Sequence, residues 1–419
     1  MKKYNLIVVG GGLSGICASV AASRAGLDVL LIEKSGVLGG ALSNSMVFPF
    51  MPIWTMDPQT RQKKYLSGGI FKEIINRQDD PCSETDVLNF NPELIKIFLD
   101  KIVSEANVDV LFHTVLYDVV KEDRTIKSIK VIAGSEKLSF DADYFIDTTG
   151  DGNLFYMAGC DYQLGRESDN LCQPMTTCFR MSGIDMDIFR TDIGKVQRLY
   201  KEKQKNGEIS NPRENILYFD KIGQGTLHFN TTRVIKLNPT DPFDVSKAEM
   251  IAREQIYEIV NFLKEASPAF KNSRIISIAS DIGVRESRKL RGEHILTGDE
   301  LINCTKFDDG IALGNYDLDI HNPSGTGTSH HYFKPGEYYS IPYRSLLPKE
   351  FDNLLVAGRC LSATHEAQAS VRTMPICACM GEAAGLAVAV ATQTNTNTHT
   401  LDINTLREKL RSNGAILEV

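Results

Sequence analysis

Residues 4–15 read YNLIVVGGGLSG, and this stretch decides the fold. Tyr4 to Val9 is a β-branched, apolar run that is typical of a buried strand. It leads into a glycine cluster and then into an alanine-rich apolar segment, which stops at Gly26 as a helix does when it ends in a left-handed turn. Residues 28–32 (DVLLI) predict a second strand, and Glu33 stands at its end. This order predicts a parallel βαβ unit.

The glycines of this turn fit the pattern G-x-G-x-x-G at Gly10, Gly12 and Gly15. The first permits a tight turn, the second lets the backbone approach a pyrophosphate, and the third allows close packing of helix on strand. The helix N-terminus offers free N–H groups to phosphates, and Glu33 stands where a carboxylate accepts hydrogen bonds from ribose hydroxyls. A dinucleotide site is therefore predicted, with a purely structural βαβ unit as the alternative. The carboxylate suits FAD and NAD equally.

Composition and charge narrow the class of protein. The 419 residues suffice for two or three domains, and the net charge is −7 with lysines and arginines spread along the chain. A nucleic-acid partner would demand a basic face, so none is expected. Three glycines interrupt the apolar run after Met1, which argues against a secretion signal. Residues 376–391 carry Glu382 and fall short of the roughly 20 residues of a membrane span, so we expect a soluble cytoplasmic protein without a membrane partner.

Nine cysteines are scattered along the chain without a C-x-x-C pair and without the spacing of zinc or iron–sulfur ligands. We expect most of them to be buried, reduced thiols, as in a cytoplasmic enzyme.

Three later segments repeat the signature of the first turn. Residues 38–43 (LGGALS) place a second glycine pair close behind Glu33, although an ordinary loop is the alternative. Residues 144–152 form a strand that delivers a glycine-flanked acid, Asp151, to a sheet edge, where open α/β sheets bind ligands. Residues 354–359 (LLVAGR) read as a buried strand and a glycine turn. An apolar helix then opens near Pro375, and its free N–H groups can face negative charge on a ring system.

Between these segments the pattern changes. After about Cys160 the chain shows short antiparallel strands and a long amphipathic helix, with Ser246 as the expected N-cap and Glu249 completing a capping box. We expect an α/β fold: a Rossmann-like three-layer cofactor-binding domain with an inserted α+β substrate (cap) domain. The expected boundaries are 1–160 for the first part of the cofactor domain, 161–340 for the insert, 341–395 for the return segment and 396–419 for a tail with a short helix.

The sequence resembles the FAD-dependent oxidoreductases of the glutathione reductase/fumarate reductase flavoprotein-like superfamily, and more closely a family related to the flavin subunit of heterodisulfide reductase. The segments that carry the resemblance are VVGGGLSG with Glu33, LGGALS, DTTGDG at 147–152, NLLVAGRCLSATHEAQASVRTMP at 353–375, VRESRKLRGE at 284–293 and IPYRSLLP at 341–348. The resemblance implies FAD as the cofactor. No histidine follows Gly40, where some relatives attach FAD covalently, so the FAD is expected to be non-covalent. No C-x-x-x-x-C follows the glycine pair, which argues against a pyridine nucleotide–disulfide oxidoreductase and leaves NAD(P)H unsupported as a direct donor.

In such flavoproteins the first glycine turn holds the pyrophosphate, the acid holds the adenosine ribose, and the second glycine pair lies near the ribityl chain and flavin. A strand beginning near Val115 touches the adenine, Asp151 contacts the pyrophosphate or ribityl side, and the last helix points at the pyrimidine end of the flavin. The cofactor-binding residues that the resemblance implies are Gly10, Gly12, Leu13, Ser14, Gly15, Glu33, Lys34, Gly39, Gly40, Ala41, Ser43, Val115, Thr149, Gly150, Asp151, Gly358, Arg359, Gly381 and Ala383.

Two residues after the last glycine turn are catalytic candidates. In the fumarate reductase relatives a histidine and an arginine in this region help to bind a substrate carboxylate, and His365 and Arg372 occupy comparable places. A guanidinium group matches a carboxylate well. In the alternative, His365 packs against Glu366, and Arg372 ties the loop to the sheet.

The inserted segment adds further candidates. Arg285, Arg288 and Arg291 recur every three residues; a solvated basic face is the default, but Arg285 and Arg291 are candidates to reach the substrate. The Gly/Ser/Thr-rich stretch 322–335 is a candidate lid. Three histidines in and beside it invite a metal, but their spacing disfavours one, and no metal is expected.

The sequence thus predicts an FAD-dependent oxidoreductase that transfers a hydride between non-covalent FAD and a small polar, possibly carboxylate-bearing, organic substrate. The electron donor or acceptor and the oligomeric state are left open. A flavin oxidase or monooxygenase-like enzyme that uses oxygen is the alternative, and a flavin-dependent RNA-modifying protein is a third interpretation.

Overall fold

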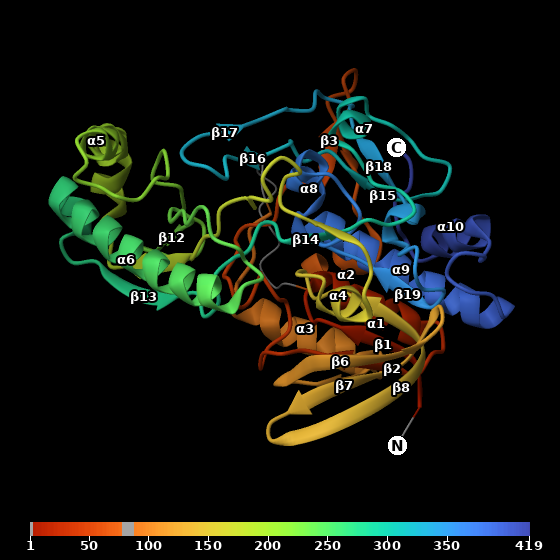
Figure 1. The fold of residues 1–419 in the computed structure, drawn as a ribbon. Coiled ribbons are helices and arrows are strands. Elements are labelled where there is room, and N and C mark those ends of the chain that lie inside the picture. Colours follow the sequence, from red (N-terminus) through yellow and green to blue (C-terminus); the bar gives the residue numbers. More distant parts are fainter. Residues whose placement is uncertain (1–2, 78–87) are drawn as a thin grey trace.

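A computed structural model of the chain describes residues 3–77 and 88–419 (Figure 1). Its centre is a seven-stranded sheet in which parallel strands lie in the order β5, β2, β1, β8 and β19. The first half of β8 also pairs antiparallel with β7, which pairs with β6. The strands are β1 (Tyr4–Val9), β2 (Val29–Ile32), β5 (Asp109–Leu111), β6 (Thr114–Glu122), β7 (Thr125–Ala133), β8 (Glu136–Asp147) and β19 (Leu354–Val356).

Alternating side chains of the parallel strands enter two different cores, which makes the domain three-layered. Leu6 and Val8 of β1 pack with the helices, whereas Ile7 and Val9 pack with the β6–β7 hairpin and α4. The helices are α1 (Leu13–Arg24), α2 (Gly69–Asn76), α3 (Leu94–Glu105), α4 (Asn153–Ala158), α9 (Met374–Thr394) and α10 (Ile403–Ser412). The predicted fold class is confirmed.

An inserted lobe, at the left of Figure 1, has a core of its own. Its antiparallel sheet runs in the order β11, β12, β10 and β13, and Phe179 stacks on Phe229 with ring centroids 4.8 Å apart. Its elements are β10 (Phe179–Ser182), α5 (Met186–Lys205), β11 (Tyr218–Phe219), β12 (Leu227–Phe229), α6 (Pro242–Ala266), a 3₁₀ turn (Pro268–Phe270) and β13 (Arg274–Ile278).

The remaining short elements join this lobe to the main sheet. Several of their residues, including Ile311, Tyr339 and Ile341, pack in the same core as α1 and α9, so the stretch expected as the insert divides its packing between two cores. The elements are β3 (Trp54–Met56), β4 (Lys63–Tyr65), β9 (Tyr162–Leu164), β14 (Arg288–Leu290), α7 (Gly298–Ile302), β15 (Gly310–Gly314), β16 (Ile320–His321), β17 (Thr328–Ser329), β18 (Tyr339–Pro342), a 3₁₀ turn (Tyr343–Leu346) and α8 (His365–Val371).

The predicted start of the long helix was wrong. Helix α6 begins one turn earlier, at Pro242, because the Asp241 carboxylate accepts from the N–H groups of Phe243 and Asp244 and caps the helix. Ser246 lies inside the helix, where its hydroxyl donates to the Pro242 carbonyl.

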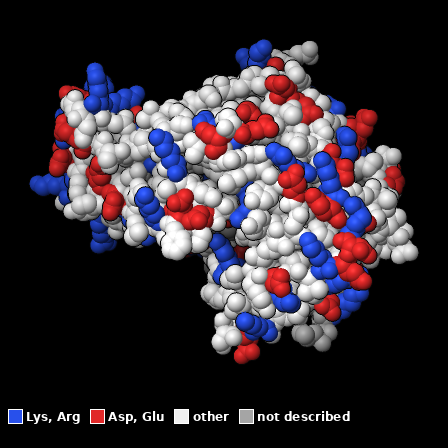
Figure 2. Space-filling model, in the orientation of Figure 1, with Lys and Arg blue, Asp and Glu red and all other residues white. Residues whose placement is uncertain are grey.

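Helix α9 is long and apolar enough to cross a membrane, but 94% of its most apolar window is buried within the protein. Such burial is typical of the core helix of a soluble protein; the cytoplasmic location remains a prediction. Acidic and basic side chains are intermixed on the face shown in Figure 2. The eight described cysteines are free, and seven of them are buried; Cys82 lies outside the described residues.

Candidate functional site

The first glycine turn lies between β1 and α1 and leaves space on one side only. A Cβ on Gly10, whose φ is +109°, would lie 2.5 Å from the Thr148 carbonyl oxygen, and one on Gly15 would lie 1.9 Å from the Gly10 carbonyl oxygen. A Cβ on Gly12 would meet no atom within 4 Å. Packing therefore requires Gly10 and Gly15, whereas the open side of Gly12 is room for a ligand.

The second glycine pair lies directly against the first turn, as predicted from its position in the sequence. The Gly39 N–H donates to the Gly11 carbonyl at 2.8 Å, and a Cβ on Gly40 would lie 3.0 Å from the Gly12 Cα. The hydroxyl of Ser43 donates to the Leu38 carbonyl and stabilises the loop, and Ala41 is exposed.

The N-terminus of α1 presents unused donors beside Gly12. No side chain caps this helix, so the first N–H groups, starting at Leu13, have no partner within it. The Ser14 hydroxyl is buried without a hydrogen-bond partner among the described residues, and a Cβ on Gly358 would lie 3.3 Å from it. The turn after β19 thus lies against the same helix end. These donors, together with the helix dipole, fit a pyrophosphate.

Glu33 is buried beside this turn, and its carboxylate is oriented by two backbone groups. Its Oε2 accepts from Gly11 N–H at 2.7 Å and its Oε1 from Ser35 N–H at 2.8 Å. Each oxygen retains a second acceptor site for a ribose hydroxyl. The start of β6 is joined here, since Thr114 N–H donates to the Glu33 carbonyl, and the side chains of Lys34 and Val115 are exposed nearby in sequence.

Asp151 joins three segments of the chain. Its carboxylate accepts from Arg359 at 2.7 Å and from the Ser287 hydroxyl at 2.8 Å. Burial disfavours the carboxylate, but the Arg359 charge outweighs it and lowers the pKa of Asp151. Gly150 has φ +76°, and a Cβ there would lie 2.9 Å from Arg359, while the Thr149 hydroxyl donates to Asp147. In this structure Asp151 and Arg359 therefore bind each other.

Two of the predicted cofactor-binding residues need correction. A Cβ on Gly381 would lie 2.0 Å from the Ser14 carbonyl oxygen, so this glycine permits the close crossing of α9 and α1. Ala383 is fully buried in the core, two turns or more from the start of α9. We assign both residues to helix packing, because only the first N–H groups of a helix are free for a ligand.

His365, at the start of α8, belongs to a buried cluster of charged groups. Its Nδ1 lies 2.7 Å from Glu286 Oε2, and Glu286 Oε1 lies 2.5 Å from Lys289 Nζ. Glu286 and Lys289 are fully buried. Burial works against the Glu286 carboxylate, but the hydrogen bond from His365 and the Lys289 charge prevail and lower the pKa of Glu286. The partner of His365 is thus Glu286, and the expected alternative contact with Glu366 is wrong.

Arg285 and Arg372 meet beside a carboxylate. Arg372 lies 3.5 Å from Asp319, and its Nε is buried without a hydrogen-bond partner among the described residues. Arg285 donates to the Pro174 carbonyl and the Thr176 hydroxyl. Burial, and then the charge of Arg372, lower the pKa of Arg285 to about 9.

Two more arginines, from the inserted lobe, add to this positive charge. The Arg213 and Arg233 charges also lower the pKa of Arg285, and Glu214 lies 3.1 Å from Arg233 and 3.7 Å from Arg213. The buried Arg213 Nε lies 3.7 Å from Glu214 and donates no hydrogen bond among the described residues. Four guanidinium groups thus lie around two carboxylates, Glu214 and Asp319.

Arg291, predicted as a catalytic residue, makes its contacts away from Arg285 and Arg372, and its catalytic role remains a prediction. It donates to Gln163 at 2.6 Å, and its half-exposed side chain faces Asp161 on the surface. Strand β14 turns Lys289 inward and Arg288 outward, where the Arg288 guanidinium stacks 4.0 Å from the Tyr156 ring centroid.

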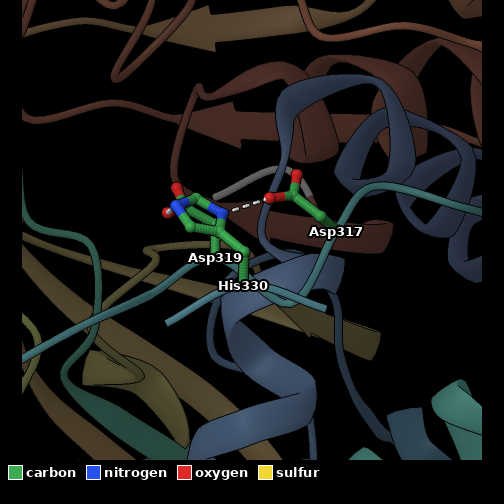
Figure 3. Close-up of side chains that lie close together, drawn as sticks. All are labelled: Asp317, Asp319 and His330. Atoms are coloured by element: carbon green, nitrogen blue, oxygen red, sulfur yellow. Dashed lines mark hydrogen bonds and ion pairs between the residues drawn. The ribbon is translucent and has the colours of Figure 1, made fainter. Parts of the chain in front are cut away.

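The loop after β15 adds the acidic side of the site (Figure 3). His330 lies between two carboxylates, with its Nδ1 2.5 Å from Asp317 and its Nε2 3.8 Å from Asp319. Asp319 also accepts from His321 at 3.1 Å and Tyr316 at 3.2 Å. Burial opposes the Asp319 carboxylate, but His321 and the nearby arginines lower its pKa. The ligand atoms of Asp317, Asp319 and His330 lie within 4.8 Å of one another. Because arginines surround Asp319, we assign this cluster to hydrogen bonding.

Sequence reasoning found Arg285, Arg372 and His365 but missed Glu286, Lys289 and Asp319. Glu286 and Lys289 stand inside the quoted segment VRESRKLRGE, where the arginines drew attention. Asp319 was signalled only by the short D-x-D pattern before His321.

Known proteins were compared with this chain by sequence and by structure. A sequence model of the FAD dependent oxidoreductase family matches residues 5–410. Among solved structures, a geranylgeranyl bacteriochlorophyll reductase-like protein from Thermoplasma acidophilum is 14% identical, with a TM-score of 0.46 over 99% of this chain and 85% of its own. The myxobacterial chondrochloren halogenase is 13% identical, with a TM-score of 0.45 over 99% and 79% of the two chains. The p-nitrophenol 4-monooxygenase of Pseudomonas putida is 12% identical, with a TM-score of 0.40 over 71% and 72%. With TM-scores below 0.5, these likenesses say nothing about the reaction.

Proposed function

We propose, on the premise that this chain belongs to the family of FAD-dependent oxidoreductases, that it transfers a hydride between non-covalent FAD and a small organic substrate that carries a carboxylate. The observation that carries the proposal is an excess of positive charge, in which the buried Arg213 and Arg233 and the partly buried Arg285 and Arg372 lie around Asp319 and Glu214. The relation to the flavin subunit of heterodisulfide reductase remains a prediction from the sequence.

Buried arginines are costly unless an anion meets them. Arg372 has one long contact with Asp319 and an unpartnered Nε, so its guanidinium edge is free to receive two oxygens of a carboxylate. Arg285 is the second positive group beside it. A substrate carboxylate would offset the mutual repulsion of these arginines, which no neutral sugar or hydrocarbon can do.

The residues of the first domain fit FAD. The open side of Gly12, the free N–H groups of α1 and the unpartnered Ser14 hydroxyl suit the pyrophosphate, and Glu33 suits the adenosine ribose. When bound, FAD supplies the hydride acceptor or donor, and the protein has to hold the substrate and manage a proton.

His365 is the residue that we propose for the proton. Glu286 accepts a hydrogen bond from Nδ1, which fixes the tautomer and leaves the Nε2 lone pair available as a base. A carboxylate–imidazole pair of this kind holds the ring in one orientation. Gln173 links this pair to the arginines, since its backbone N–H donates to Glu286 and its side chain bonds to Gln368. The Gln368 side chain in turn donates to the Arg285 carbonyl.

The test is anaerobic reduction of the purified, FAD-loaded protein by a panel of hydroxy acids, with the matching alcohols and sugars as controls. We expect at least one acid to bleach the flavin absorbance while its uncharged analogue does not. Equal bleaching by neutral compounds would overturn the proposed substrate class. Oxygen admitted to the reduced protein then separates a dehydrogenase, which reoxidises slowly, from an oxidase. A salt-sensitive shift of transfer RNA would instead favour the RNA-modifying interpretation.

A further inference from the structure

Helix α6 of the inserted lobe carries three large apolar side chains on its solvent side. Phe243, Met250 and Tyr257 are 84%, 57% and 69% exposed. They are spaced seven residues apart, and seven residues of an α-helix return to within about 20° of the same line. Ile259, on the opposite side of the helix from Met250, is buried in the core of the lobe. The three residues therefore form one apolar stripe along the exposed side of α6, a helix that Figure 1 shows at the outer edge of the inserted lobe.

Two residues of opposite charge stand within the same stripe. Lys247 and Glu254 fall between the apolar residues, so that positions 243, 247, 250, 254 and 257 repeat the four–three spacing of a coiled-coil seam. Both side chains are exposed, and neither has an ion pair within residues 3–77 and 88–419. Arg253, by contrast, pairs with Glu249 at 2.8 Å on the side of the helix.

We propose that a second copy of this chain covers the stripe, with α6 packed antiparallel on α6 of the partner about a two-fold axis at Met250. Phe243 and Tyr257 lie equally far from Met250, so reversal of the partner helix places each Phe243 against the partner's Tyr257. A two-fold interface makes every such contact twice.

The charges select this arrangement. Lys247 stands three residues before Met250 and Glu254 four residues after it, which is about 4.5 Å and about 6 Å along the helix axis. In the antiparallel pair Lys247 therefore lies level with the partner's Glu254 to within about 1.5 Å. A parallel pair would place Lys247 against the partner's Lys247, and like charges at such positions are repulsive. An anionic surface as occupant is disfavoured because Glu254 lies in the stripe itself.

The first test is the mass of the full-length, FAD-loaded protein by sedimentation and light scattering. We expect a dimer of twice the 46.5 kDa chain, and we expect Met250→Glu to raise the dimer dissociation constant by at least about tenfold. Ile276→Glu is the matched control, because Ile276 is an exposed apolar residue (49%) on β13 of the same lobe. It should leave the dimer intact.

The second test is charge reversal. Lys247→Glu and Glu254→Lys should each weaken the dimer by about tenfold, and the double variant should restore it, because both ion pairs re-form with their signs exchanged. Met250→Cys should give a disulfide-linked dimer on oxidation. A wild-type monomer at the highest soluble concentration, an unchanged mass of Met250→Glu, or a double variant as weak as the singles would each overturn the proposal. None of these results bears on FAD binding or on the substrate.

Discussion

His365 Nδ1 lies 2.7 Å from Glu286 Oε2, and the two side chains come from segments 79 residues apart in the chain. Lys289 binds the other carboxylate oxygen, so the three side chains form one buried unit in which Glu286 is charged. Since Nδ1 is bound to Glu286, Nε2 is the ring nitrogen for which we propose the proton exchange with a substrate.

Removal of the Glu286 carboxylate should disturb the orientation and tautomer of the His365 ring, and with them the proposed proton transfer. Because Lys289 would otherwise be left buried and unpaired, the change is made as Glu286→Gln with Lys289→Met. We expect the rate of flavin reduction to fall by about 10²-fold, since the glutamine amide can donate to Nδ1 and leave the imidazole in the wrong tautomer. Stopped-flow absorbance measures this rate.

The matched control for this pair is Glu366→Gln, an exposed glutamate beside His365 in the sequence. It should leave the rate of flavin reduction unchanged. A double variant that reduces the flavin at the wild-type rate would show that Glu286 only supports the fold.

Arg372→Ala should retain bound FAD, because Arg372 contacts Asp319 and not the glycine turns. We expect substrate-driven bleaching to need an at least about tenfold higher concentration of the acid, which is the loss of one charge-assisted hydrogen bond. Titration of the FAD-loaded protein under anaerobic conditions gives the comparison. Arg291→Ala is the control, since its side chain is half-exposed and binds Gln163. Wild-type bleaching by Arg372→Ala would remove this residue from the substrate site.

The parts of this molecule that were predicted from sequence are those whose physics is local. A glycine turn between a strand and a helix, and an acid at the end of the next strand, specify a βαβ unit over about thirty residues, and Gly10 and Glu33 lie as that motif requires. The contact of Gly39 with Gly11 was predictable for the same reason. Gly11 follows β1 and Gly39 follows β2, and these neighbouring parallel strands end at the same edge of the sheet.

The errors arose where a long-range contact or a stronger local signal decided the outcome. Nothing near His365 in the sequence points to Glu286, because the two segments meet through backbone contacts between residues far apart in the chain, such as Leu290 N–H to the Cys360 carbonyl and Thr364 N–H to the Leu296 carbonyl. The recurrence of arginine every three residues, at Arg285, Arg288 and Arg291, did not reveal the course of β14. This strand turns Lys289 inward and leaves Arg291 at the surface. Asp241 followed by Pro242 is a better helix start than Ser246, since Pro suits the first helical position.

Gly12→Ala should separate FAD binding from folding. The Gly12 backbone has φ −68°, which alanine adopts freely, and the added methyl group meets no protein atom. We expect an unchanged melting temperature of the FAD-free protein but at least about tenfold weaker FAD affinity, because the methyl group occupies the place proposed for the pyrophosphate. Flavin fluorescence titration measures the affinity.

Two further glycines serve as controls for this substitution. Gly194→Ala in α5 adds a methyl group that makes an ordinary contact, at 3.8 Å, with the end of the Arg198 side chain, and it should leave FAD affinity unchanged. Gly15→Ala should fail to fold, since its Cβ would lie 1.9 Å from the Gly10 carbonyl oxygen. Tight FAD binding by Gly12→Ala would contradict the proposed place of the cofactor.

Glu382, buried in α9, should make the protein less stable as pH rises. Its Oε2 accepts from Ile70 N–H, but its Oε1 has no partner among the described residues, and burial raises its pKa to about 7. In the unfolded state the pKa of this side chain is about 4.5, so its folded pKa is the higher of the two. The protonated carboxyl group therefore stabilises the fold fully below about pH 4.5, and this contribution is lost as the pH rises to about 7. The free energy of unfolding should fall by about 3 kcal/mol over this window, and Glu382→Gln, which keeps an acceptor for Ile70, should abolish the fall.

Urea unfolding between about pH 4.5 and 8 measures the free energy of unfolding of the wild type and of Glu382→Gln, with exposed Glu408→Gln as the control. Parallel pH profiles of wild type and Glu382→Gln would show that Glu382 remains charged in the folded protein.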